Sequence, residues 1–154
     1  MNKEMQSIIR NLQNTISGEP WYGKPISVLM AEVDSSKASV RPYNKGHSLN
    51  DILYHMIFWS EYTIHCVNLN SPVGGFEKLD WPALVPTEDS WQNGISEFKN
   101  IHQKLIELLQ TKEDEFLKVM IPGTNYNFRF LLNGLIQHNI YHGGQIAYLT
   151  KILE

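Results

Sequence analysis

Two histidines close to the C-terminus, His138 and His142, are four positions apart in a segment with helical periodicity. Residues four apart lie one turn apart on the same face of a helix, so the two imidazoles can point at one atom. Both fall on an apolar stripe, between Leu135 and Ile146, where buried polar groups need partners. Neutral imidazole is a common metal ligand, so a metal ion is one partner that would satisfy both rings.

The same spacing has a plainer interpretation. Each ring can make one hydrogen bond in the core, or the helix can be rotated so that both rings lie at the surface. Position 139 is Asn139 and not the glutamate of a zinc-protease motif, so the pair does not predict a metalloprotease. The pair alone therefore leaves the metal and the structural interpretations open.

A third histidine, His55, lies in the middle of the most apolar segment, between Ile52 and Phe58. An isolated buried imidazole there is costly unless a group from another helix meets it. Metal sites in helix bundles are built from side chains on facing helices. His55, His138 and His142 together offer three nitrogen ligands and an open fourth position, as in catalytic zinc-type sites. If they share one ion, their nitrogens must converge to roughly 3–3.5 Å of one another.

The remaining histidines are expected at the surface or at a boundary. His47 precedes a helix start, His65 lies well round its helix from His55, and His102 flanks the stripe of its own helix. Cys66 has no basic neighbour in the sequence and is interpreted as core filler. No nucleophile elbow, phosphate-binding loop or dinucleotide fingerprint occurs.

Length and composition limit the classes of protein to which this chain can belong. The 154 residues are expected to form one domain over 1–154, and the 42% hydrophobic and 19% charged contents are globular values. A net charge of -3 without a Lys/Arg cluster gives no reason to expect nucleic acid as a partner. One cysteine, with no apolar run of signal-peptide or membrane-span length, predicts a cytoplasmic protein with no membrane partner.

Helical periodicity defines the elements that must position the histidines. Long helices are predicted over about 3–16, 48–67, 87–109 and 128–152, and short ones near 26–33 and 113–119. Ser48 and Asp51 indicate a capped helix start. Asn68 to Pro86 is predicted to be a long loop of the kind that often rims a functional site. The glycine pair Gly143-Gly144 can either let a neighbouring helix approach closely or leave room for a ligand beside His142. Four long amphipathic helices predict an all-α helical bundle.

Two segments resemble a known family. The run H-N-I-Y-H-G-G-Q-I, from His138 to Ile146, resembles the H-x-x-x-H-x-G-Q signature of the DinB/YfiT-like superfamily. The run G-H-S-L-N-D-I-L-Y-H-M-I-F-W, from Gly46 to Trp59, resembles the second-helix segment that carries the first metal histidine of that family. Trp21-x-Gly23 and Arg41-Pro42 also resemble its N-terminal part, whereas 68–127 matches only in length and helical character.

The resemblance implies a four-helix bundle in up-down-down-up order, often a homodimer. It implies a divalent ion of nickel or zinc type held by His55, His138 and His142, with Gln145 outside the ligand set. Activities in the superfamily include thiol-dependent transfer and isomerisation with bacillithiol or mycothiol. The expected partners are therefore a small-molecule substrate and a low-molecular-weight thiol.

Three functional hypotheses follow. The first is a metal-dependent bacillithiol S-transferase or hydrolase, whose ion would activate a bound thiol or water. No general base is identified, since Tyr141 and Gln137 face away from the histidine stripe, and this favours the thiol version. The second is a non-enzymatic metal-binding stress-response protein with a fourth protein ligand. The third is a structural bundle in which His55 points away from the pair.

The enzyme hypothesis also predicts a cavity at the open position. We expect this cavity to be bordered by the loop Asn68 to Pro86 and by Trp59 and Tyr62, which can hold an apolar part of a substrate.

Overall fold

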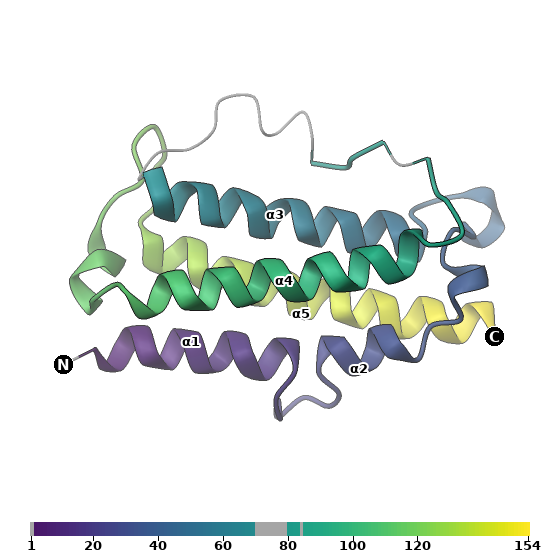
Figure 1. Cartoon of the computed structure of the whole chain (residues 1–154), viewed down its shortest axis with the longest axis horizontal. Helices are drawn as coiled ribbons and strands as arrows, with labels where there is room; N and C mark the ends of the chain where they lie inside the picture. The colour runs from purple at the N-terminus through teal and green to yellow at the C-terminus, as the bar shows by residue number, and fades with distance from the viewer. Residues whose placement is uncertain (1, 70–79, 84) are drawn as a thin grey trace.

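The chain is built from helices in a computed structural model that describes residues 2–69, 80–83 and 85–154 (Figure 1). The α-helices within these residues are α1 (Lys3–Ile16), α2 (Ile26–Ala31), α3 (Leu49–Leu69), α4 (Ser90–Gln110) and α5 (Phe128–Leu153). The connections within the described residues also contain the short 3-10 helices η1 (Ser35–Lys37), η2 (Pro42–Asn44) and η4 (Asp114–Lys118). Extended pairing in the described ranges is limited to one bridge, between Met120 and Asn127. The all-α prediction is confirmed.

The four longer helices lie side by side (Figure 1). α1 and α5 run in one direction along the long axis, and α3 and α4 run in the other. α3 packs against both α4 and α5, α1 packs against α4 and α5, and the short α2 packs on α5. The contact between α3 and α5 matters most here, because these two helices carry the three histidines of the candidate site. The four-helix-bundle class and its up-down-down-up order stay predictions.

Local chemistry explains where the two helices beside the long loop begin. At the start of α3 the backbone N–H of Ser48 donates to the Asp51 carboxylate at 2.8 Å, and that of Asp51 donates to the Ser48 hydroxyl at 3.1 Å. This reciprocal pair confirms the predicted cap. α4 begins at Ser90 and not at Thr87, because the Ser90 hydroxyl accepts the Thr87 N–H at 2.7 Å and closes a turn ahead of the helix.

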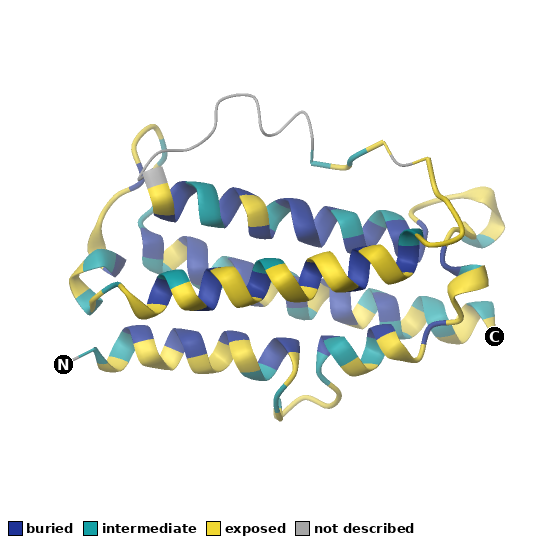
Figure 2. Cartoon of the chain, in the orientation of Figure 1, coloured by how far each residue is buried: buried dark blue, intermediate teal, exposed yellow. Residues whose placement is uncertain are grey.

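Buried residues face inward on all four longer helices (Figure 2). Close approach between helices depends on glycine at two places. A Cβ on Gly94 of α4 would lie 2.7 Å from a methyl of Leu53 on α3, and one on Gly143 of α5 would lie 3.2 Å from Ile26 on α2. Helix approach therefore accounts for Gly143, whereas a Cβ on the exposed Gly144 would meet nothing within 4 Å. None of the described helices combines the length and the apolar character needed to cross a membrane.

Candidate metal centre

The three predicted histidines come together between α3 and α5. The Nε2 atoms of His55 and His138 are 2.9 Å apart, although 83 positions separate the two residues in the chain. One ring nitrogen from each of His55, His138 and His142 lies within 4.8 Å of the others. The Nε2 atoms of His55 and His138 are slightly closer than the expected 3–3.5 Å, whereas the separations to His142 are bounded only at 4.8 Å. The ligation of a metal by these residues stays a prediction.

The ring of His55 is held from the loop that follows α3. Its Nδ1 lies 2.7 Å from the backbone carbonyl oxygen of Asp80 and 3.2 Å from the carboxylate of the same residue. The carboxylate also accepts the indole N–H of Trp59 at 2.6 Å. Because both neighbours of Nδ1 are acceptors, Nδ1 carries the proton and Nε2 presents a bare lone pair.

His142 is oriented in the same way by its own helix. Its Nδ1 lies 2.5 Å from the side-chain oxygen of Gln145, whose amide nitrogen donates to the Tyr141 hydroxyl at 3.2 Å. The Gln145 oxygen is an acceptor, so Nδ1 of His142 is the donor and Nε2 is bare. Gln145 thus supports the ring of His142. Its expected place outside the ligand set stays a prediction.

A cation fits this donor set. A ring nitrogen of His142 lies within 4.8 Å of ring nitrogens of His55 and His138, and the Nε2 of His138 lies 2.9 Å from that of His55. Because the Nδ1 atoms of His55 and His142 already donate, Nε2 is the nitrogen that each of these two rings has left for an ion. A single proton on His138 can satisfy only one of the two bare nitrogens. The Nδ1 of His138 is buried without a hydrogen-bond partner. One proton among three converging imidazole nitrogens leaves a lone pair without a partner, and a divalent ion in place of that proton would satisfy all three nitrogens.

The electrostatics keep two of the rings neutral. Burial, reinforced by the neighbouring His142 and His55, lowers the pKa of His138 to about 3. Burial also lowers the pKa of His142, partly opposed by its hydrogen bond to Gln145. A histidine binds metal in its neutral form, so protons compete weakly for these two rings at neutral pH.

An aromatic stack covers the outer side of His55. The ring of Trp81 stacks on His55 with centroids 3.9 Å apart and on His47 with centroids 3.6 Å apart. Trp81 is 37% exposed, whereas His55 is 5% exposed. The part of the expected loop rim at residues 70–79 lies outside the described residues. Sequence reasoning named neither Asp80 nor Trp81, because a loop carries no periodicity that would show which of its residues fold back.

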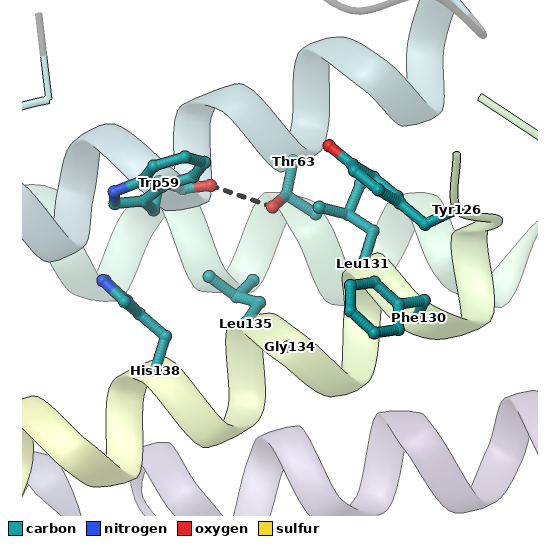
Figure 3. A pocket seen from close by; sticks show the side chains of 8 residues that line it. All are labelled: Trp59, Thr63, Tyr126, Phe130, Leu131, Gly134, Leu135 and His138. Carbon is teal, nitrogen blue, oxygen red and sulfur yellow. Dashed lines mark hydrogen bonds between the residues drawn. The ribbon is translucent and has the colours of Figure 1, made fainter. Parts of the chain in front are cut away.

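A cavity of about 250 Å³ lies beside His138, between α3 and α5 (Figure 3). Trp59 lines it, as the sequence led us to expect. Tyr62, which was also expected at the cavity, is not among the residues that line it; its hydroxyl lies 3.2 Å from that of Tyr126, which does line it. The cavity therefore runs along the two helices that carry the histidines.

The expectation that His102 lies at a surface or boundary is wrong, because this residue is 1% exposed. Its Nδ1 lies 2.8 Å from the Phe98 carbonyl, and its Nε2 lies 3.0 Å from the Asn139 amide nitrogen and 3.3 Å from the Ser60 hydroxyl. Burial lowers its pKa to about 4. Spacing could have shown this, since His102 is four positions after Phe98 and three before Leu105 on one helix face.

Comparison of the chain with protein-family models, with curated proteins and with solved structures finds no match. Membership of the DinB/YfiT-like superfamily therefore stays a prediction that rests on the sequence motifs.

Proposed function

We propose that this chain is a metal-binding protein of DinB/YfiT-like type, a four-helix bundle in up-down-down-up order in which His55, His138 and His142 hold one nickel- or zinc-type ion. The helix directions in Figure 1 and the motifs on α3 and α5 support the fold. One observation carries the metal proposal. Nε2 atoms from residues 83 positions apart meet at 2.9 Å, and a nitrogen of His142 reaches the same region.

The chain's own residues prepare this site for an ion. The Asp80 carbonyl oxygen and the Gln145 side-chain oxygen accept hydrogen bonds from the Nδ1 atoms of His55 and His142, so each ring has Nε2 left for an ion. Such outer partners commonly orient metal-binding histidines and raise their basicity. Low pKa values keep His138 and His142 unprotonated at neutral pH.

Three ligands with an open position support an enzyme. A divalent ion held there would lower the pKa of a coordinated thiol or water, so that the conjugate base is present near neutral pH. We propose a metal-dependent S-transferase that uses a low-molecular-weight thiol such as bacillithiol, or a hydrolase, with a small-molecule substrate. The thiol version is favoured because the nearby Asp80 carboxylate already accepts from Trp59 and lies against His55, so it is poorly placed to act as a general base.

The alternative is a non-enzymatic metal-binding stress-response protein. That role needs a fourth protein ligand to close the shell, and the converging group among the described residues consists of three histidines. A homodimer and a cytoplasmic location remain further parts of the proposal, drawn from the resemblance and the composition.

The test begins with metal. Untagged protein should bind about one Zn²⁺ or Ni²⁺ per chain, measured by elemental analysis and by competition with a chromophoric chelator. Replacing any one of His55, His138 or His142 with alanine should weaken binding by about a hundredfold or more, because one of three ligands is lost. His47→Ala is the matched control, since His47 contacts the Trp81 stack but not the converging nitrogens. Equal affinities for the wild type and the three variants would disprove the site.

A thiol-conjugation screen then separates the enzyme from the metal-binding protein. Metal-loaded protein is incubated with bacillithiol and a panel of small electrophiles, and the His142→Ala variant serves as the inactive control. Metal binding without turnover of any thiol or hydrolysable ester would favour the non-enzymatic alternative.

A further inference from the structure

The cavity beside His138 is an elongated groove between α3 and α5 (Figure 3). It is lined by residues from both helices and from the turn before α5: Trp59, Thr63, Tyr126, Phe130, Leu131, Gly134, Leu135 and His138. His138 and Trp59 stand at one end, with ring centroids 6.1 Å apart, and Phe130 and Tyr126 stand at the other. The eight helical positions from Phe130 to His138 span about 12 Å. Phe130 is 67% exposed, so its end opens toward solvent.

The lining offers almost no polar contact away from His138. None of its eight side chains is acidic, lysine or arginine. The Thr63 hydroxyl already donates to the Trp59 carbonyl at 2.8 Å, and the Tyr126 hydroxyl is paired with that of Tyr62 at 3.2 Å. A charged group placed in this groove would lose water without gaining a partner, which is costly. An apolar group would gain burial against aromatic and leucine side chains.

Gly134 forms part of the groove wall without a packing reason to be glycine. Glycine in a helix interior costs up to about 1 kcal/mol relative to alanine. At Gly94 and Gly143 neighbouring side chains at 2.7 Å and 3.2 Å explain the missing side chain, but a Cβ on Gly134 would meet nothing within 4 Å. A side chain at this position would occupy the groove.

We propose that this groove binds the neutral, apolar portion of the substrate, one ring with a short chain in size, and presents its reactive group beside His138. The link to a reaction rests on the metal-dependent function proposed above, whereas the groove's preference for neutral apolar ligands does not. The size follows from the volume. A cavity of about 150 Å³ lined by apolar side chains holds benzene, and this one has about 250 Å³. Specificity thus resides in the stretch from Gly134 to Phe130, away from the three histidines.

The first experiment measures binding to metal-free protein by ligand-observed NMR, with benzyl alcohol as the neutral probe and benzoate as the charged one. Wild type should bind benzyl alcohol about tenfold or more tightly than benzoate. Gly134→Leu should weaken benzyl alcohol binding by about tenfold or more, because the added side chain takes the place of the ring. Gly144→Leu is the matched control on the same helix, outside the groove and with nothing near its Cβ, and should bind as wild type does.

Melting curves establish that the variants fold, and Gly134→Ala provides a smaller obstruction if the leucine variant does not. Equal binding of the two probes, or equal binding by wild type and the Gly134 variants, would overturn the groove proposal.

The second experiment tests where the reactive group lies. Phenylmethanethiol is added to Co²⁺-loaded protein, and the thiolate-to-cobalt absorption band reports sulfur at the metal. Wild type and Gly144→Leu should bind this thiol about tenfold more tightly than 2-mercaptoethanol, and Gly134→Leu should lose that preference while keeping its affinity for Co²⁺.

The two proposals fail separately. If the protein does not bind Co²⁺ but still prefers benzyl alcohol, the metal-dependent function is wrong and the groove proposal stands. If the wild type binds Co²⁺ but shows no preference for the aromatic thiol, the groove is not the substrate site and the metal site stands.

Discussion

Removal of the buried imidazole at position 102 should flatten the acid dependence of stability. His102 is 1% exposed, and its ring is surrounded by α3, α4 and α5 through Ser60, Phe98 and Asn139. Nδ1 donates to the Phe98 carbonyl and Nε2 accepts from the Asn139 amide, so the ring is neutral in the folded chain. A second proton on Nε2 would meet the Asn139 amide donor at 3.0 Å and have only the Ser60 hydroxyl oxygen, 3.3 Å away, as an acceptor.

The size of the effect follows from the pKa. Burial lowers the pKa of His102 to about 4 in the folded chain, against about 6.5 in an unfolded one. Between these values the unfolded chain binds more protons, so stability falls as pH falls. At 1.36 kcal/mol for each pH unit, about 3 kcal/mol of unfolding free energy is lost between pH 6.5 and 4, and about 2 kcal/mol of it is already lost at pH 5.

The assay is urea unfolding of metal-free wild type and His102→Asn at pH values from 8 to 5. The variant should be less stable at pH 8, because hydrogen bonds and volume are lost, yet its stability should decline by about 2 kcal/mol less over this range. His138, whose pKa is also low, contributes equally in both proteins and cancels. Gln103→Ala, an exposed neighbour, is the control for substitution on this helix. Parallel pH profiles for wild type and His102→Asn would refute the reasoning.

Three further outcomes are expected. Chelation should lower the melting temperature of metal-loaded protein, and His142→Ala should abolish that shift, because the unfolded chain lacks the site; a melting curve unmoved by chelator would contradict this linkage. Metal retention measured from pH 8 to 3 should hold near neutral pH and fall in acid, with a midpoint below about 6.5, since burial lowers the pKa of His138 and His142; retention that stays flat down to pH 3 would argue against an all-histidine shell. Asp80→Ala removes the carboxylate beside Nδ1 of His55 and its hydrogen bond from Trp59 but keeps the backbone carbonyl, so it should weaken metal affinity about tenfold in a competition titration, and an unchanged affinity would show that the carboxylate does not support the site.

Sequence reasoning reached the helices and the three histidines because both follow from periodicity. The i, i+4 spacing of His138 and His142 fixes their common face without any knowledge of tertiary structure. His55 required one further step, that a buried imidazole in a very apolar helix needs a partner on a facing helix. The contact between α3 and α5 supplies that partner.

Two further features were not predicted, for different physical reasons. Asp80 and Trp81 belong to a loop, where no repeating geometry relates position in the chain to direction in space. His102 was expected to flank the apolar stripe of its helix, although its spacing from Phe98 and Leu105 places it on the buried face. In the folded chain three neighbouring polar groups form hydrogen bonds with the buried ring.

The distance along the chain between His55 and His138 has a consequence for local opening. In the absence of an ion, local opening of α5 away from α3 is opposed only by the packing of α5 on its neighbours. An ion coordinated from both helices would add a cross-link between His55 and His138, 83 positions apart in the chain, that such opening must first break. Amide protons of α5 would then exchange with solvent only through global unfolding, and protease cleavage within it would slow to the same limit. Slower hydrogen exchange in α5 would thus report the bound ion without any measurement of the metal itself.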